Sequence, residues 1–300
     1  MPVEPPIETP TSLPDAYAIL AASTSDEQVT PIAGGTDLMV RITGEIGDPP
    51  RRMVDLSRLE ELRGISLDGG AVVLGALTTY TEIRRSGLCR EHLPTLVEAA
   101  ATIGAAQIQN RGTLGGNAAN ASPAGDTLPV LLSLDASFVV GGSRGERTIQ
   151  ADRFWVAYRR TALEPDEVIL RVRIPLAGSR EARFRKIGTR RAQAISKVVL
   201  AVAWRESMEP PPSSSSGHAP VAGWRDVRVA LGSVADRPIR AVSTESVLEG
   251  RRPTQVTADA AAEALAAEIQ PIDDVRSTAD YRRAVAARAL HRMIRDAGGW

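Results

Sequence analysis

The spacing of apolar residues alternates along the chain between a helical period and a strand-like period. Apolar and charged side chains interchange across residues 167–175, which is typical of a β-strand. Leu96, Ala99 and Ile103 instead recur at helical spacing and predict a helix over 92–104. The mixture predicts an α+β fold. The same reasoning places further strands at 29–33, 53–57, 71–77 and 137–142, and further helices at 14–23, 37–43, 81–86 and 129–136.

The pattern changes near residue 180, which predicts a second domain. Four short apolar segments there predict strands, of which the first three form one antiparallel sheet, and two helices follow. The expected domains are therefore 1–178, with subdomains of about 1–55 and 56–178, and 179–300. A Pro/Ser-rich stretch at 209–223 predicts a flexible hairpin extension, to which we assign no function. The strands are expected at 184–188, 197–204, 227–234 and 238–242, and the helices at 258–268 and 279–296.

A glycine- and asparagine-rich segment between two apolar stretches is the strongest candidate for chemistry. Residues 112–126 read GTLGGNAANASPAGD, and almost none of these residues favours a helix or a strand. Adjacent glycines let the backbone take positive φ and let another molecule approach closely. Successive backbone N–H groups in such a turn bind anions, above all phosphates. The segment predicts a phosphate-binding loop, whose alternative is a plain surface loop.

A second glycine-rich turn follows the strand at 29–33. Gly34 and Gly35 precede Thr36 and Asp37, either of which would cap the helix predicted at 37–43. A helix start with free glycine amides predicts a second phosphate-binding site. A simple strand-to-helix turn would explain the same residues equally well. Two such sites suit a pyrophosphate held from both sides, as in a dinucleotide. The GxGxxG and GxxxxGK[ST] patterns are absent, which argues against a Rossmann unit and a P-loop.

Composition excludes several classes of protein. The 36 cationic and 36 anionic side chains cancel, so no net field recruits nucleic acid or an anionic membrane. No apolar run approaches 18 residues, and the N-terminus lacks a signal-peptide pattern, so we expect a cytoplasmic protein without a membrane span. The single cysteine, Cys89, excludes an internal disulfide and an iron–sulfur cluster held by this chain alone. Cys89 with His92 as a nucleophile and base is much less favoured than a buried thiol.

Four segments together carry a resemblance to a known family. They are PIAGGTDLM from residue 31, LGALTT from residue 74, NRGTLGGNAANASPAGD from residue 110 and RKIGTRRAQAISKV from residue 185. The chain resembles the FAD-binding medium subunit of the molybdenum hydroxylases, the carbon monoxide dehydrogenase and xanthine dehydrogenase family, over nearly its whole length. The resemblance implies a two-subdomain FAD-binding domain of the vanillyl-alcohol-oxidase type, followed by a small domain of antiparallel sheet and helices.

The resemblance also implies which residues bind FAD. The turn at residues 33–37 would hold the pyrophosphate from one side, and the segment at 113–117 would hold it from the other. Polar residues further along would bind the ribityl and adenosine hydroxyls, and two isoleucines would flank the isoalloxazine and adenine. Lys186, which with Lys197 is one of two lysines in an arginine-rich chain, would lie near the flavin. The full set is Ala33, Gly34, Gly35, Thr36, Asp37, Ile103, Thr113, Gly115, Gly116, Asn117, Asn120, Ser122, Asp126, Ile169 and Lys186.

Three positions depart from the family pattern. Ile103 stands where xanthine dehydrogenases have an aromatic residue, so looser flavin stacking or a substitute such as Tyr80 is expected. Gln109 replaces a frequent arginine, and residues 192–194 replace a common acidic pair. These differences leave open which electron acceptor meets the flavin.

The function implied is electron relay, with no catalytic side chain in this chain. FAD would be bound non-covalently, while a molybdenum-cofactor large subunit and a [2Fe–2S] small subunit would complete a dimer of heterotrimers. NAD, quinone, oxygen or another carrier would take the electrons. Two alternatives remain: a stand-alone FAD oxidase or reductase of the same fold, and a flavin-less relative kept for assembly. The second predicts a colourless protein that added FAD does not stabilise.

Overall fold

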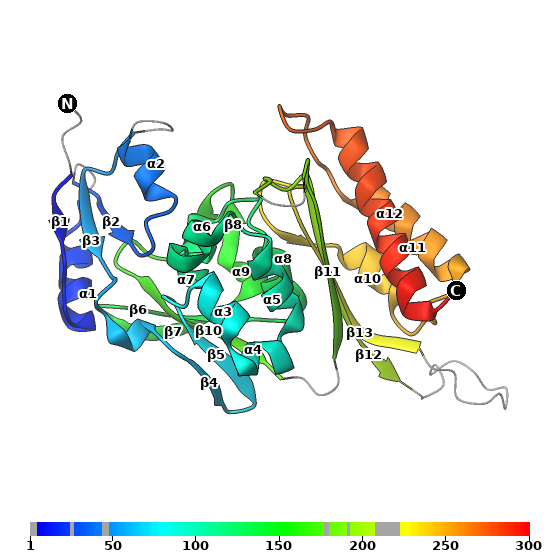
Figure 1. The fold of residues 1–300 in the computed structure, drawn as a ribbon, viewed down its shortest axis with the longest axis horizontal. Helices are drawn as coiled ribbons and strands as arrows, with labels where there is room; N and C mark the ends of the chain where they lie inside the picture. Colours follow the sequence, from blue (N-terminus) through cyan, green and yellow to red (C-terminus); the bar gives the residue numbers. More distant parts are fainter. Residues whose placement is uncertain (1–4, 25–26, 44–47, 177–179, 191–192, 208–222) are drawn as a thin grey trace. The chain divides into compact units, whose positions relative to one another are not determined.

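A computed structural model describes residues 5–24, 27–43, 48–176, 180–190, 193–207 and 223–300 (Figure 1). The chain forms two compact units. Unit 1 contains residues up to Ser122 and Ala136–Pro175, and unit 2 contains Pro123–Asp135 and the chain from Leu176 onward. The predicted domain division at residue 178 stays a prediction, and most of the predicted hairpin extension at 209–223 lies outside the described residues.

Unit 1 holds two sheets with different strand directions. The smaller sheet has the order β1-β3-β2, and its strands pair in parallel. The larger one has the order β4-β5-β10-β6-β7 and is antiparallel. The strands are β1 (Ile7–Glu8), β2 (Val29–Ile32), β3 (Arg52–Asp55), β4 (Ile65–Asp68), β5 (Ala71–Gly75), β6 (Ser137–Gly142), β7 (Gly145–Gln150) and β10 (Val168–Pro175), with a separate hairpin of β8 (Trp155–Ala157) and β9 (Arg160–Thr161).

The helices of unit 1 are short. The sequence pattern located α1, α2, α3 and α5, and the helix predicted over 92–104 corresponds to α5, whereas His92 ends the preceding α4. Pro94 begins α5, because proline has no N–H to continue a helix but fits a first turn. The helices are α1 (Leu13–Ala21), α2 (Leu38–Ile42), α3 (Tyr80–Arg85), α4 (Gly87–His92), α5 (Pro94–Ala101), α6 (Ala106–Arg111), α7 (Leu114–Asn120) and α9 (Ala151–Phe154), with a 3₁₀ turn at Glu60–Leu62.

Unit 2 is an antiparallel sheet of order β11-β12-β13-β14 with helices packed on it. All four strands predicted from the sequence share this sheet, one more than expected. Helices α11 and α12 pack against each other and, with the alternate apolar residues of β12, form one core cluster. The elements are α8 (Leu128–Ser133), β11 (Glu181–Ile187), β12 (Val198–Ser207), β13 (Gly223–Gly232), β14 (Ile239–Arg240), α10 (Val242–Leu248), α11 (Gln255–Glu268) and α12 (Ala279–Gly298).

Strand β12 explains why residues 123–135 belong to unit 2. Residues 198–204 read VVLAVAW, without alternation, and every one of them is buried. Val198, Leu200 and Val202 belong to the core cluster on one face. Helix α8 contacts β12 and β13, and its Pro129 ring would meet a Cβ placed on Gly232 at 3.2 Å. A strand covered on both faces needs no polar side, which accounts for the uninterrupted apolar run.

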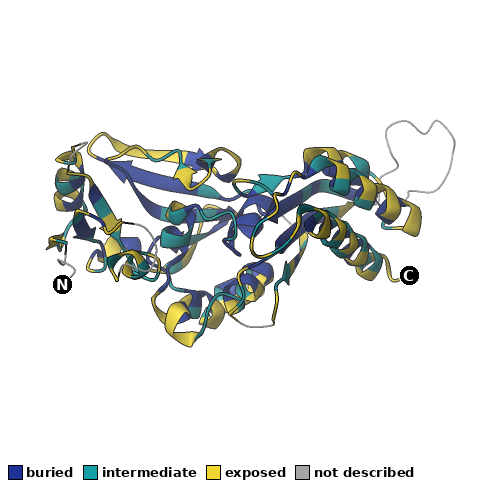
Figure 2. Cartoon of the chain, turned by 90° about the horizontal axis from the view of Figure 1, so that it is seen from above, coloured by how far each residue is buried: buried dark blue, intermediate teal, exposed yellow. Residues whose placement is uncertain are grey.

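Burial follows the strands of both units. The inner strands β5, β6 and β10 of unit 1 and β12 and β13 of unit 2 are buried along most of their length, whereas the edge strands β4 and β7 and the helix surfaces are largely exposed (Figure 2). Among the described residues, no helix is long and apolar enough to cross a membrane.

Candidate functional site

The glycine-rich segment at 34–37 forms a turn between β2 and α2. Gly35 adopts a φ of +75°, a conformation that glycine takes without strain. Asp37 occupies the N-cap position of α2, but its side chain makes no capping hydrogen bond. The prediction that Thr36 or Asp37 is the cap residue is therefore confirmed for Asp37 by its position, without a side-chain hydrogen bond.

The backbone amides of this turn are unused. Across the described residues, the N–H groups of 34–37 donate to no protein acceptor, although the carbonyl of Gly35 accepts from Met39 N at 2.9 Å. All four residues keep at least part of their surface exposed. Successive unused amides in a turn are suited to bind an anion. We call residues 34–37 the GGTD turn.

In the glycine-rich segment at 112–126, the predicted loop is a helix over Leu114–Asn120, and only the residues after it form turns. Thr113 adopts extended backbone angles, and its hydroxyl accepts from the Gly116 amide at 3.0 Å, which starts α7 at Leu114. Gly115 and Gly116 do not take positive φ. The helix ends at Ala121, which has a left-handed φ of 50°. A capping threonine outweighed the low helix propensity of glycine and asparagine.

The amides of α7 are taken by protein groups. Leu114 N donates to the Thr78 carbonyl at 2.9 Å, and Gly115 N donates to the Ala76 carbonyl at 2.9 Å. Asn117 N donates to the Thr113 carbonyl at 3.0 Å. The LGALTT segment, which contains Ala76 and Thr78, therefore accepts hydrogen bonds from the first turn of α7 and holds it in place. With the Gly116 amide bound to Thr113, these four N–H groups are committed to the fold.

Gly115 permits this close seat. A Cβ at Gly115 would lie 2.7 Å from both the Cβ and the carbonyl oxygen of Ala76. Such distances are too short for van der Waals contact, so the absence of a side chain is a packing requirement.

The GGTD turn and α7 lie against each other. A Cβ at Gly34 would sit 1.9 Å from the Arg111 carbonyl oxygen, just before the helix. At the other end of α7, Asn120 Nδ2 donates to Asp37 Oδ1 at 2.8 Å across 83 residues of chain. Ala33 also approaches α7, at 4.0 Å from a Cβ built on Gly116. The turn therefore runs along the helix from its N-terminus to its C-terminus.

Asp37 carries a perturbed carboxyl group. Although the residue as a whole is exposed, burial of the carboxyl beside α7 raises its pKa above the usual range. The Arg159 guanidinium and the hydrogen bond from Asn120 act in the opposite direction. A carboxyl that is difficult to ionise next to unused amides is an unusual local arrangement.

The predicted apolar contacts differ in exposure. Ile103 is half-buried after α5, and its carbonyl accepts from Gln109 Nε2 at 2.9 Å. Gln109 is buried and also accepts from Arg84 at 2.5 Å, so the residue that replaces the family arginine holds the backbone around Ile103. Ile169 is buried in β10 opposite Val140. The flavin-flanking role of both isoleucines stays a prediction.

Tyr80 does not replace the missing aromatic residue. Its side chain is 3% exposed, and its ring lies 2.9 Å from the position of a Cβ on Gly112. The ring supports the segment before α7 from within the fold. Asn117 within α7 and Ser122 after it are half-buried, and their contacts to the cofactor stay predictions.

Two predicted site residues meet in unit 2. Lys186 Nζ on β11 lies 2.6 Å from Asp126 Oδ2, and the two side chains are 10% and 8% exposed. The sequence assigned Asp126 to ribose hydroxyls and Lys186 to the flavin ring, without pairing them. A buried lysine is stabilised by such a partner. Lys197, in contrast, lies over the Tyr281 ring at 4.8 Å, a packing contact within unit 2.

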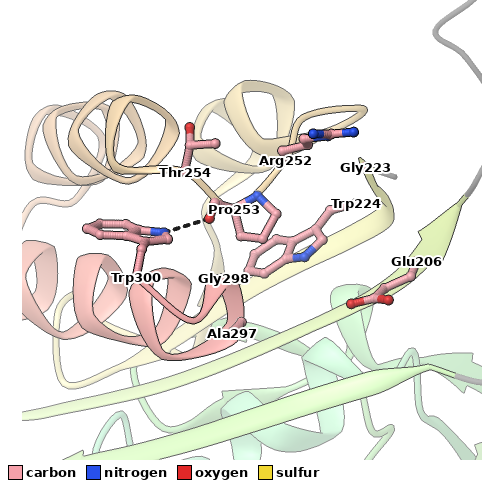
Figure 3. Close-up of a pocket in the computed structure, with 9 residues that line it drawn as sticks. All are labelled: Glu206, Gly223, Trp224, Arg252, Pro253, Thr254, Ala297, Gly298 and Trp300. Carbon is pink, nitrogen blue, oxygen red and sulfur yellow. Dashed lines mark hydrogen bonds between the residues drawn. The ribbon is translucent and has the colours of Figure 1, made fainter. Parts of the chain in front are cut away.

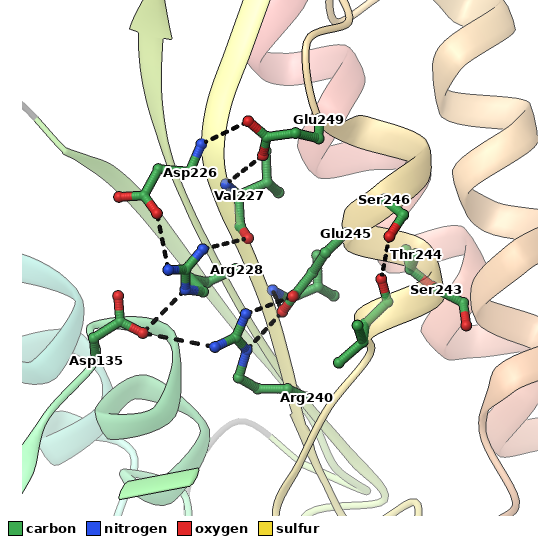
Figure 4. A network of polar contacts seen from close by, with 12 residues as sticks. Asp135, Asp226, Val227, Arg228, Arg240, Ser243, Thr244, Glu245, Ser246 and Glu249 are labelled. Carbon is green, nitrogen blue, oxygen red and sulfur yellow. Dashed lines mark hydrogen bonds and ion pairs between the residues drawn. The ribbon is translucent and has the colours of Figure 1, made fainter. Parts of the chain in front are cut away.

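An arginine–carboxylate network fixes the end of the segment that carries Asp126. Asp135 ends this segment with a left-handed φ of 51°. Its carboxylate accepts from Arg180 at 3.0 Å. It also accepts from Arg228 at 3.0 Å and lies 3.7 Å from Arg240 (Figure 4). Arg240 in turn binds Glu245 on α10. The network is structural, because each charge it contains faces an opposite charge.

Two cavities lie apart from the predicted residues. One of about 300 Å³ in unit 2 is lined by Trp224 and by Trp300, whose indole donates to the Pro253 carbonyl at 2.7 Å (Figure 3). Another of about 590 Å³ in unit 1 lies among α3, α5 and α6. None of the residues assigned to FAD lines either cavity.

Cys89 is a buried structural residue. Its side chain is fully buried in α4, and burial raises the pKa of the thiol. A thiol that resists ionisation is a poor nucleophile. This agrees with Cys89 as a buried structural thiol and argues against a nucleophile–base pair with His92.

The sequence did not identify the β8–β9 hairpin. Trp155 donates to the Ala118 carbonyl of α7 at 3.0 Å, and Arg159 donates to Asn120 Oδ1 at 2.9 Å. Arg159 has no motif around it, and two-residue and three-residue strands leave too short a pattern to recognise.

Comparisons with known proteins agree along the whole chain. Residues 3–177 match the family profile described as the FAD binding domain in molybdopterin dehydrogenase, and residues 183–297 match the CO dehydrogenase flavoprotein C-terminal domain. The carbon monoxide dehydrogenase medium chain of Hydrogenophaga pseudoflava is 32% identical over 286 residues, which cover 95% of this chain and 94% of that protein. The nicotine 6-hydroxylase medium subunit of Paenarthrobacter nicotinovorans is 32% identical, covering 97% and 96%.

Solved structures have the same fold. A chain of the Hydrogenophaga pseudoflava carbon monoxide dehydrogenase superimposes with a TM-score of 0.87 at 31% identity, covering 97% of this chain and 96% of that one. A chain of quinoline 2-oxidoreductase from Pseudomonas putida 86 gives 0.86 at 26% identity, covering 100% and 98%. The predicted fold class is confirmed, and this chain belongs to the family of FAD-binding flavoprotein subunits of the molybdenum hydroxylases.

Proposed function

We propose that unit 1 binds the pyrophosphate of a non-covalent FAD at the GGTD turn. The observation that carries this proposal is the row of unused amides at 34–37 beside α7. Phosphate oxygens accept hydrogen bonds from such amides, and glycine leaves the main chain open to them. Helix α7 supports the turn instead of offering its own amides. The contribution of Thr113, Gly115 and Gly116 is therefore to seat α7 so that the turn keeps its shape.

Polar side chains near α7 suit the hydroxyls of the cofactor. Asn117, Asn120 and Ser122 offer amide and hydroxyl groups that can both donate and accept. We assign them to the ribityl and ribose hydroxyls, and Ile103 and Ile169 to the apolar ring contacts. Asp126 and Lys186 are assigned to the cofactor on the family resemblance, as a buried ion pair whose two charges offset each other.

We propose that the chain relays electrons within a larger enzyme. Bound FAD would supply two-electron redox chemistry with one-electron steps, and this chain's residues would bind it, orient it and limit water around it. Electrons would come from [2Fe–2S] clusters in a small subunit, and the molybdenum cofactor would lie in a large subunit. NAD, a quinone, oxygen or another carrier would accept the electrons, the assembly would be a dimer of heterotrimers, and the location would be the cytoplasm.

An absorption spectrum of the purified chain, titrated with FAD, tests the proposal. We expect flavin bands that denaturation releases into solution, with one FAD per chain, and a rise in melting temperature with added FAD. Bleaching by NADH under anaerobic conditions would favour NAD over quinone or oxygen. A colourless protein whose stability ignores FAD would support the assembly relative instead. Substrate oxidation by the isolated chain would support the stand-alone oxidase.

A further inference from the structure

The β8–β9 hairpin of unit 1 is anchored to α7. The Trp155 indole donates to the Ala118 carbonyl at 3.0 Å, and its side chain is 4% exposed. Its ring meets the Phe138 and Phe154 rings edge-on, at centroid distances of 5.5 and 5.4 Å. A buried aromatic cluster with a satisfied indole N–H defines the position of the hairpin base.

The hairpin presents a guanidinium at one end of the GGTD turn. Arg159 lies between the two strands with a φ of 50°, a conformation that is uncommon for residues other than glycine. Its Nη1 donates to Asn120 Oδ1 at 2.9 Å, and the amide of Asn120 donates to Asp37 Oδ1 at 2.8 Å. A line of hydrogen bonds thus joins the guanidinium, α7 and the last residue of the turn.

The Asp37 carboxyl and the Arg159 guanidinium act on a bound anion in opposite directions. Asp37 adds a carboxylate beside the amides of 34–37, and a carboxylate repels a phosphate. Arg159 is close enough to lower the Asp37 pKa, so it offsets that repulsion. The residue is exposed, and a guanidinium carries five N–H donors in a planar fork that matches phosphate oxygens. One donor is used by Asn120, which orients the others.

We propose that Arg159 is a pyrophosphate-binding residue of the FAD site. Its guanidinium keeps the bond to Asn120 and donates a second, charge-assisted hydrogen bond to a phosphate oxygen held by the amides of the GGTD turn. This inference rests on the proposed FAD binding and adds a side-chain cation to a site that otherwise uses main-chain donors. Arg159 acts in binding and takes no part in electron transfer.

Fluorescence titration of the full chain, stripped of flavin, with FAD tests the role. Arg159→Ala should bind FAD at least about tenfold more weakly at low salt, the loss expected for one charge-assisted hydrogen bond. The difference from wild type should shrink at high salt, because screening already weakens the contact. Arg159→Lys should recover part of the affinity. Arg160→Ala is the matched control: Arg160 is the adjacent exposed arginine of the same hairpin, and this variant should bind as wild type does.

Two results would overturn the inference while leaving FAD binding intact. One is wild-type affinity in Arg159→Ala. The other is an equal loss at low and high salt that lysine does not restore, since that pattern indicates displacement of the hairpin. A wild-type chain that binds no FAD would instead contradict the proposed function itself, so the two failures are distinguishable. Thermal unfolding of each variant without FAD verifies that the fold is retained.

Discussion

The two glycine-rich segments of unit 1 look alike in sequence but use their backbones differently. In the GGTD turn, Gly35 takes a positive φ and the amides of 34–37 have no protein acceptor among the described residues. In α7, the amides of 114–117 are all bonded to protein groups. The first segment has the features of a ligand contact, and the second has the features of a support.

Glycine is required in these two segments for two different physical reasons. Gly35 is required by conformation, whereas Gly115 is required by the approach of Ala76 to 2.7 Å from its missing Cβ. Accounting for every amide distinguishes the two, because a committed N–H cannot also bind a phosphate. Gly34 belongs to both cases: it lies in the ligand turn, yet its missing side chain admits the Arg111 carbonyl.

The largest effect is expected for Gly115→Ala. The new methyl would collide with the Ala76 backbone, and overpacking of this kind costs about 2 kcal/mol of unfolding free energy, net of the helix propensity gained. Urea denaturation measures the loss. FAD affinity of the folded fraction should fall less than in Gly35→Ala, because the amides of α7 do not bind the phosphates. Gly87→Ala, at an open helical position in α4, is the control and should be neutral or slightly stabilising. A stable Gly115→Ala would remove the packing explanation.

Gly35→Ala should weaken FAD binding more than it lowers the free energy of unfolding. Its Cβ has ordinary space, with Ile32 at 3.5 Å, but the left-handed backbone costs about 1 kcal/mol for alanine. Relief of that strain rotates the amides of the turn, so we expect FAD to bind at least about tenfold more weakly. Equilibrium titration and urea denaturation of the same sample separate the two quantities. Unchanged FAD affinity would mean that the turn is not the phosphate contact.

The smallest effect is expected for Asp37→Asn, which keeps an acceptor for Asn120 but carries no charge. Burial raises the folded-state pKa of Asp37, so between about pH 4 and that raised value the folded chain binds more protons than the unfolded chain. The free energy of unfolding is therefore higher at low pH, and this extra stability of the folded chain is lost as the pH rises through the folded-state pKa of Asp37. Denaturation midpoints from pH 3.5 to 7 should therefore fall less steeply for the variant.

Asp152→Asn, an exposed carboxylate in α9, controls for the general effect of one fewer negative charge. If the Asp37→Asn profile runs parallel to that of wild type, the pKa of Asp37 is not raised in the folded chain, and the prediction is wrong.

Much of the fold could be predicted from local pattern, and the errors have physical causes. The apolar pattern located β10, β12, α11 and α12, because each of these elements is long enough for its pattern to be recognised. It missed β8 and β9, which are too short for a period, and α7, where one hydroxyl cap overrode composition. The pairing of Asp126 with Lys186 crosses 60 residues, and no local rule predicts such a contact.

The sequence by itself determined the family, the α+β class and the segments that carry the glycine turns, because these depend on residue identity and spacing along the chain. Only the tertiary structure decided which amides are free, because hydrogen-bond acceptors such as Ala76 and Thr78 come from distant segments. It also brought Arg159 to Asn120, since the position of that hairpin depends on the burial of Trp155 in an aromatic cluster. Binding capacity depends on which groups the fold leaves unsatisfied, and that is a property of packing.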